Sequence, residues 1–279
     1  MSKRLASGLI ELEGGCNFRE VSGYLSEDGR CLRPGLLFRS GVLSYFTFAD
    51  QDRLRSLGIR TIVDLRRAEE RRREPTRWDD PRTRVLHMEQ APDPPPVMRA
   101  ALRDAPDPHG MRQLMLELYR AMPDFQAGRL RVLLESLMVG ETPVLVHCSA
   151  GKDRTGFVVA VLLEALGIAR EQVLHDYGLT NTAVDLERFV FECRTGAGVA
   201  DDAHPLKRIP AAVRQVLLTA DPAYLCAAFE RLEADYGSVQ GYLQRRLGLD
   251  AGALGCLRGS MLCEQPVTLG SAANDRATP

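Results

Sequence analysis

One stretch of the chain constrains its fold more than any other: an apolar segment, a short polar loop and a second apolar segment follow each other directly. Residues 143–147 form the short apolar run expected of a buried strand. Residues 157–166 predict a buried helix, because the apolar run that they open is broken by Glu164 and is about half as long as a membrane span. A strand that passes through a tight loop into a helix is the unit from which α/β folds are built.

Further elements are predicted on the N-terminal side of this unit. Residues 49–57 have helical spacing and stop at Gly58, and the apolar run 60–65 is typical of a second buried strand. Residues 85–88 predict another short strand. The pair Asp28-Gly29 indicates a hairpin in an irregular β segment near the N-terminus.

Helices dominate the remaining predictions. Residues 111–138 have the apolar spacing of one or two amphipathic helices, which Pro123 separates or bends. After residue 172 the chain is expected to be helical, with breaks near 196–198, 221–222, 237 and 248. We therefore expect an α/β fold with a small, mostly parallel sheet flanked by helices on both faces.

Composition excludes several classes of protein. Of the 279 residues, 45% are hydrophobic and 26% charged, as in ordinary soluble domains, and 36 Lys+Arg against 37 Asp+Glu leave no basic field for nucleic acid. The seven cysteines form no C-x-x-C pair or Cys/His cluster, which argues against a zinc site or a disulfide framework. No apolar stretch of secretory length precedes Glu11. We expect a cytoplasmic protein without stable membrane insertion, and leave open a secretion route that reads no N-terminal signal.

The loop 147–156 carries the chemistry. It leads from a strand end into a helix start, where backbone N–H groups and the helix dipole create an anion site that a phosphate group fits. The same field stabilises a thiolate, so we expect Cys148 to be a nucleophile near neutral pH. Arg154 lies six residues further on and can offer its guanidinium to two phosphoryl oxygens. A nucleotide-binding P-loop is excluded, because His147 and Asp153 stand where that motif needs Gly and Ser or Thr.

Cys148 and Arg154, separated by five residues, preceded by His147 and followed by Thr155, resemble the signature of cysteine-dependent protein tyrosine phosphatases. More narrowly, the loop resembles that of a bacterial family of tyrosine phosphatases and of phosphoinositide phosphatases with an Asp inside the loop. The resemblance extends over nearly the whole chain, through Asn17-Phe18-Arg19, Arg33-Pro34-Gly35, Phe38-Arg39-Ser40, Asp64-Leu65-Arg66, Asp176-Tyr177 with Asn181, Tyr236-Gly237-Ser238 and Tyr242-Leu243. It implies a single phosphatase domain over 1–265 and a flexible tail over 266–279.

The resemblance also implies a role for each residue of the loop. Cys148 would attack phosphorus and form a phosphocysteine intermediate. Asp153 would protonate the leaving group and then activate the water that hydrolyses the intermediate. Thr155 would donate a hydrogen bond to the sulfur. The phosphoryl group would be bound by Arg154 and by the other loop residues, Ser149, Ala150, Gly151 and Lys152.

Residues outside the loop have less certain roles. The resemblance implies that Asp64 contacts Arg154, and the alternative is that Asp64 only caps the following helix. Asn17 and Arg19 either hold the rim of the site or support the sheet. His147 is expected to support Cys148 through hydrogen bonds.

Two further segments have competing interpretations. The charged run 66–74 is interpreted as a solvated helix face, with Arg66 as the exception. Trp78-Asp79-Asp80 resembles a mobile acid loop but lacks its proline.

The implied substrate is a phosphotyrosine protein, with dual or triple specificity open and a phosphoinositide lipid as the alternative. Lys152 favours multiply phosphorylated lipids in related enzymes and does not exclude phosphotyrosine. No metal or organic cofactor is implied. A helical lid over about 179–235, with a hinge at 195–210, is expected to cover the site. Two other classes remain: a binding module that has lost catalysis, and a sulfurtransferase-like loop carrying a persulfide, against which Asp153 argues.

Overall fold

The core of the molecule is a five-stranded sheet that presents the loop 148–152 at its edge. The computed structural model describes residues 8–88, 107–193 and 208–264. Neighbouring strands pair in the order β1-β3-β6-β4-β5, and all pairs are parallel except β1 with β3. The predicted α/β class with a mostly parallel sheet is therefore confirmed. The strands are β1 (Arg19–Glu20), β3 (Leu37–Ser40), β6 (Val144–His147), β4 (Thr61–Asp64) and β5 (Arg84–His87).

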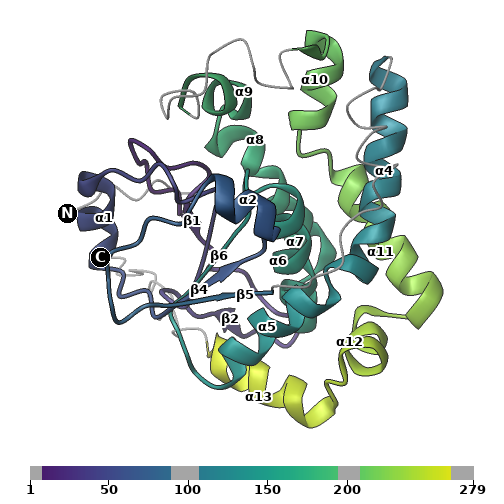
Figure 1. The fold of residues 1–279 in the computed structure, drawn as a ribbon. Coiled ribbons are helices and arrows are strands. Elements are labelled where there is room, and N and C mark those ends of the chain that lie inside the picture. Colours follow the sequence, from purple (N-terminus) through teal and green to yellow (C-terminus); the bar gives the residue numbers. More distant parts are fainter. Residues whose placement is uncertain (1–7, 89–106, 194–207, 265–279) are drawn as a thin grey trace, which may run out of the picture.

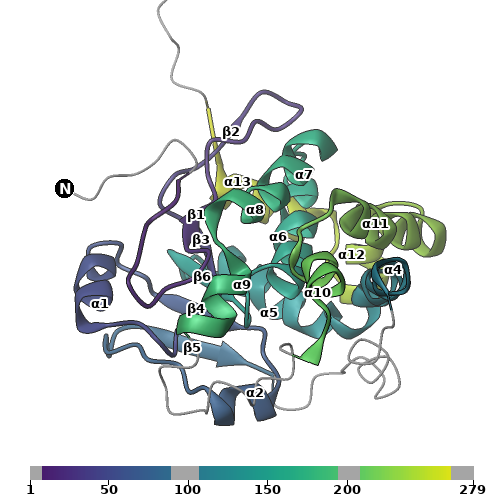
Figure 2. The ribbon, with the colours of Figure 1, turned by 90° about the horizontal axis from the view of Figure 1, so that it is seen from above.

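The apolar core has two layers, one on each face of the sheet, because side chains along a strand alternate between the faces. Val144 and Val146 of β6 belong to the main cluster, whereas Leu145 between them belongs to a second cluster, because successive side chains of a strand point to opposite faces. Helices α5 (Ala127–Met138) and α6 (Asp153–Ala165) pack on the first face. Helix α1 (Phe48–Arg55) contributes Leu54 to the second, and lies on the other side of the sheet (Figures 1 and 2).

The amphipathic segment 111–138 forms two helices, but they do not separate at Pro123. Helix α4 (Pro108–Phe125) contains Pro123 in its last turn, and the break before α5 falls at Gln126. The start of α4 is capped by the Asp107 side chain, which accepts a hydrogen bond from the backbone N–H of Gly110 at 2.8 Å. Tyr119 and the other buried residues of α4 face the main core.

Among the described residues after 172 the chain is helical as predicted, apart from its last strand, and the predicted break near 196–198 lies outside the described residues. Residues 262–263 form β7 (Leu262–Cys263), which pairs antiparallel with β2 (Cys31–Leu32), so the N-terminal hairpin is joined to the end of the described chain. Gly237 and Gly248 end helices with positive φ, as expected of C-terminal caps. The longer helices of this region are α7 (Arg170–Gly178), α10 (Ala211–Leu218), α11 (Pro222–Tyr236), α12 (Val239–Leu247) and α13 (Ala251–Met261).

Part of the predicted lid belongs to the main core. Helix α11 packs along α4 and buries Leu225, Phe229 and Leu232 in the main cluster. The other described elements of the predicted lid are α8 (Thr180–Ala183), α9 (Leu186–Arg188), the π-helix Phe189–Cys193 and α10 (Figure 1). The lid over 179–235 stays a prediction. Most of the predicted hinge and the whole tail 266–279 lie outside the described residues. Within the described residues, no helix is long and apolar enough to cross a membrane.

Candidate active site

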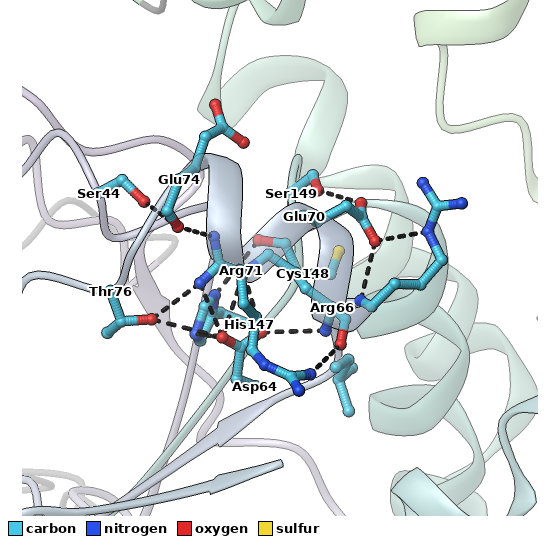
Figure 3. Close-up of polar contacts among 12 residues, drawn as sticks. Ser44, Asp64, Arg66, Glu70, Arg71, Glu74, Thr76, His147, Cys148 and Ser149 are labelled. Atoms are coloured by element: carbon cyan, nitrogen blue, oxygen red, sulfur yellow. Dashed lines mark hydrogen bonds and ion pairs between the residues drawn. The ribbon is translucent and has the colours of Figure 1, made fainter. Parts of the chain in front are cut away.

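The loop 148–152 joins β6 to α6, and β6 lies between two other parallel strands. It therefore lies at the carboxyl edge of the sheet, where ligands bind in open α/β folds. Cys148 is 2% exposed at the base of the loop, and α6 begins at Asp153. Figure 3 shows Cys148 between Ser149 and Glu70 above it and the cluster around Asp64 below it.

Three successive carbonyl groups of the loop accept hydrogen bonds from residues that lie outside the loop. The Ser149 carbonyl accepts a hydrogen bond from the Val42 N–H at 3.0 Å, and the Ala150 carbonyl accepts one from Asn17 Nδ2 at 3.3 Å. The Gly151 carbonyl accepts from Asn17 Nδ2 at 3.0 Å and from Arg39 Nη2 at 2.8 Å. Because the C=O and N–H of a peptide unit point in opposite directions, the following N–H groups face the other side of the loop. They form the preorganised donor set that an oxyanion needs.

Gly151 is required by the shape of this loop. Its φ is +68°, and a Cβ on it would lie 2.6 Å from the carbonyl carbon and oxygen of Ser40. Only glycine combines that conformation with so close an approach to the neighbouring strand.

Buried charges support the loop from below. Arg19 and Arg39 are fully buried on β1 and β3, and both bind Asp176 of α7. Arg19 also donates to the Asn17 side chain, so Asn17 and Arg19 connect the loop to the sheet. Burial, reinforced by the positive charge of Arg39, lowers the pKa of Arg19 to about 10. Two guanidinium groups against one carboxylate leave an electropositive base below the loop.

Arg154 does not contact Asp64, which corrects the prediction. Its two Nη atoms each lie 2.8 Å from one carboxylate oxygen of Glu70 in α2 (Ala68–Arg73), and Nη2 lies 3.2 Å from Ser149 Oγ. Ser149 Oγ donates to the same carboxylate at 2.8 Å, as Figure 3 shows. Although burial alone raises the pKa of a carboxyl, Arg154 and Arg67 hold the pKa of Glu70 well below its usual range.

Glu70 is the site residue that sequence reasoning missed. The run 66–74 was interpreted as a solvated face, which holds for Arg72 and Arg73 but not for Glu70. The available signal was position: the start of α2 directly follows the strand β4, whose end lies beside the catalytic loop. Because residues 66–74 are nearly all charged, the sequence pattern does not distinguish Glu70, which faces the loop, from its exposed neighbours.

Asp64 instead forms a buried pair with Arg66, the residue of the charged run expected to be exceptional. Arg66 Nη2 lies 2.7 Å from Asp64 Oδ2, and Arg66 Nη1 donates to the Glu74 carbonyl at 2.7 Å. The alternative role of Asp64 as a cap is also wrong, because Arg67 occupies the N-cap position of α2. Both Asp64 carboxylate oxygens accept from Arg66, Oδ1 from Nε at 2.9 Å and Oδ2 from Nη2, and both side chains are fully buried.

His147 contacts both this pair and the backbone of Cys148. Its Nδ1 is 3.3 Å from the Cys148 carbonyl oxygen, and its Nε2 is 3.6 Å from Asp64 Oδ2. Burial lowers the pKa of His147, against a smaller opposing effect of Asp64, so the imidazole is neutral at pH 7. It supports the backbone at Cys148, in keeping with the expected supporting role.

The remaining loop residues differ from the predicted arrangement in two respects. Lys152 is buried, and its Nζ binds Asp153 at 2.8 Å and the carbonyls of Leu217 and Thr219 at 2.9 and 3.2 Å, so it does not face the phosphate cradle. Thr155 is also buried, and among the described residues its Oγ1 has no hydrogen-bond partner, so the expected bond to the sulfur is absent.

The segment Trp78-Asp79-Asp80 does not contribute a catalytic acid to this structure. Trp78 packs against Phe46 in the second core cluster, and Asp80 pairs with Arg82. Asp153 lies beside the loop: its carboxylate is 29% exposed, and Oδ1 accepts a hydrogen bond from Tyr119 at 2.7 Å.

Comparison with known proteins agrees with the geometry. A family model described as the tyrosine phosphatase family matches residues 10–263. The chain therefore belongs to the tyrosine phosphatase family, whose members are hydrolases of phosphorylated proteins.

Several relatives are similar over most of their length. The triple specificity protein phosphatase PtpB of Mycobacterium tuberculosis is 32% identical over 283 residues, covering 90% of this chain and 98% of that protein. A provisionally named tyrosine-protein phosphatase of Cupriavidus necator is 33% identical over 243 residues, covering 85% and 84%. Among solved structures, P. aeruginosa TpbA aligns with a TM-score of 0.33 at 15% identity, over 60% of this chain and 94% of that one.

Proposed function

We propose that the chain hydrolyses phosphomonoesters of tyrosine-phosphorylated proteins through a phosphocysteine intermediate on Cys148. The observation that carries the proposal is the loop itself, with three carbonyls bound from behind, Cys148 at its base and Arg154 at its rim. In the first step the Cys148 sulfur bonds to phosphorus and the ester P–O bond breaks, while Asp153 protonates the leaving oxygen. In the second step Asp153 takes a proton from the water that attacks phosphorus, and the thiolate leaves.

Arg154 and the loop N–H groups bind the phosphoryl oxygens in this scheme. Donors that are fixed before the reaction stabilise developing charge without reorganisation, and each is worth several kcal/mol in buried sites. The contacts of Asn17 and Arg39 with the loop carbonyls keep these donors fixed. The ion pair with Glu70 fixes the Arg154 guanidinium at the rim.

Broad specificity among phosphoproteins is supported by similarity to PtpB, whose name describes triple specificity. The phosphoinositide alternative depended on Lys152 as a ligand for additional phosphates. Because the Lys152 ammonium binds two backbone carbonyls and Asp153, its geometry favours protein substrates. The binding-module and persulfide alternatives have no comparable support, since Asp153 lies beside the loop with its carboxylate partly exposed.

Phosphate release tests the proposal. Wild type, Cys148→Ser and Asp153→Asn are assayed on a phosphotyrosine peptide, a phosphothreonine peptide and phosphoinositide vesicles. We expect wild-type turnover on the phosphotyrosine peptide, none for Cys148→Ser, and for Asp153→Asn a loss of about 10²–10⁴ that is largest on poor leaving groups. Turnover by Cys148→Ser contradicts the mechanism, and faster wild-type turnover on the lipid than on either peptide contradicts the substrate class.

A further inference from the structure

The two oxygens of the Asp153 carboxylate have different environments. Oδ1 accepts a hydrogen bond from Tyr119 at 2.7 Å and an ion pair from Lys152 Nζ at 2.8 Å. Among the described residues, nothing binds Oδ2. The side chain is 29% exposed while its two donors are buried, so the exposed part of the carboxylate is on the side of Oδ2.

We propose that Tyr119 is a positioning residue for the general acid: it holds Oδ1 so that Oδ2 carries the proton that reaches the leaving group. This inference rests on the proposed function, because it assigns Tyr119 a role through Asp153. Tyr119 lies on α4, which precedes the catalytic loop in the chain and packs beside α6 and α11. It does not touch the phosphate cradle.

A second phenol fixes Tyr119 in turn. The hydroxyl groups of Tyr119 and Tyr177 lie 2.7 Å apart, and since Tyr119 donates its proton to Asp153, it accepts one from Tyr177. The two rings meet edge to face at 6.2 Å between centroids. A chain of donors that ends on a carboxylate is strengthened by mutual polarisation in a buried site.

A glycine in α6 allows this packing of Tyr177. Tyr177 packs against Gly156 in the first turns of α6, where a Cβ would lie 2.8 Å from its ring. Gly156 therefore allows the ring of Tyr177 to approach α6 closely enough to support Tyr119.

These contacts define where the proton of Asp153 lies in each step. In the protonated acid, Oδ1 is the carbonyl oxygen and accepts from Tyr119 and Lys152, and the hydrogen is on Oδ2. As the ester P–O bond breaks, its electron pair stays on the leaving oxygen, which takes this hydrogen. The negative charge left on Asp153 is stabilised at Oδ1 by the same two donors. In the second step Oδ2 takes a proton from the attacking water. Without Tyr119, Lys152 alone holds Oδ1, and the carboxyl is less firmly kept in the orientation that points its hydrogen at the substrate.

Several ionisable groups face Asp153, and their own protonation decides whether they act as donors. They are Tyr119 on α4, Tyr177 on α7, Tyr224 on α11, and Lys152 and Arg154 in the loop and its helix. Burial raises the pKa of Tyr119 and Tyr177 well above the ordinary value and that of Tyr224 to about 12. All three phenols therefore stay protonated where the enzyme is assayed, and both phenols of the donor chain remain donors.

The test compares Tyr119→Phe with Asp153→Asn, the double variant, and Tyr224→Phe. Tyr224 is the matched control, since its ring packs against Tyr119 at 5.6 Å but its hydroxyl donates to the Val216 carbonyl. kcat is measured on an aryl phosphate with a good leaving group and on an alkyl phosphate with a poor one, over a range of pH. Thermal unfolding checks that each variant is folded.

We expect Tyr119→Phe to lose about tenfold in kcat on the alkyl phosphate, the scale of one hydrogen bond to a charged group, and much less on the aryl phosphate. Adding Tyr119→Phe to Asp153→Asn should cause no further loss, since residues acting through one group are not additive. Tyr224→Phe should keep the wild-type ratio between the two substrates.

The outcomes separate this inference from the proposed function. An equal loss on both substrates by Tyr119→Phe, or a full additional loss in the double variant, shows a structural role and overturns the inference. If Tyr119→Phe does not fold, Tyr177→Phe, which removes only the donor to Tyr119, must show the same dependence on leaving group at smaller size, and its absence is equally decisive. If Asp153→Asn itself shows no dependence on the leaving group, it is the assignment of the acid in the proposed function that fails.

Discussion

Arg154 and Glu70 form a bidentate pair in which each guanidinium Nη atom lies 2.8 Å from its own carboxylate oxygen. The remaining contacts of these Nη atoms are with Ser149 Oγ at 3.2 Å and the Leu65 carbonyl at 3.4 Å. Glu70 therefore fixes the guanidinium through both of its Nη atoms. We expect a bound phosphoryl group to replace the longer contact of Nη2 with Ser149 Oγ.

Removing the Glu70 charge should weaken catalysis by releasing Arg154. We expect Glu70→Gln to lower kcat/KM about tenfold, the scale of one hydrogen bond to a charged group. The matched control is Glu69→Gln, because Glu69 is an exposed neighbour on the same helix that pairs with Arg73. Steady-state kinetics on a phosphotyrosine peptide measures both. An unchanged or higher kcat/KM in Glu70→Gln means that Glu70 competes with substrate for Arg154 instead of positioning it.

Gly151→Ala should disrupt the phosphate cradle. The new Cβ would lie 2.6 Å from Ser40 in a left-handed conformation, and we expect ~2–4 kcal/mol of lost stability together with most of the activity. Gly140→Ala is the control: Gly140 has φ +74° but open space around it, so only the backbone penalty of ~1–2 kcal/mol applies and activity is retained. Urea unfolding and phosphate release measure the two effects. Equal stability losses would show that the loop yields to the clash.

Stability should fall as the pH drops below about 6.5, partly because of His147. Burial lowers the pKa of His147 in the folded state, so the unfolded chain binds the proton more tightly and is favoured in acid. The contribution is fully present above the unfolded pKa and is lost as the pH falls below it. His147→Gln should flatten the decline in the free energy of unfolding between pH 7 and 5, whereas the same change at exposed His109 should not. A decline of equal slope in both variants rules out His147 as its source.

The central strands could be predicted from the sequence, because a run of apolar residues directly indicates a buried segment. The apolar runs 60–65 and 143–147 became β4 and β6 because a parallel strand is covered on both faces. The pair β2 and β7 was not predicted, since two-residue strands show no periodicity and their pairing joins distant parts of the chain. The predicted separation of the two helices at Pro123 was wrong, because the last turn of α4 accommodates this proline and the helix ends at Phe125.

In the site, too, residues close together in the sequence could be predicted and partners from distant segments could not. The loop motif identified Cys148, Asp153 and Arg154, since their spacing along one strand, loop and helix fixes their proximity. Partners from elsewhere in the chain could not be ranked, because several carboxylates are available to each arginine. Arg154 therefore binds Glu70 and not Asp64, and Lys152 binds backbone carbonyls near the end of α10.

The central claim is that Cys148 carries the phosphoryl group between the two steps. The most direct measurement is rapid quenching of wild type with a phosphotyrosine peptide in acid, followed by mass spectrometry of the peptide that contains Cys148. We expect one phosphoryl group on Cys148, formed as fast as the first turnover and absent from Cys148→Ser. Phosphate release at the wild-type rate with no phosphoryl group on Cys148 at any time would contradict it.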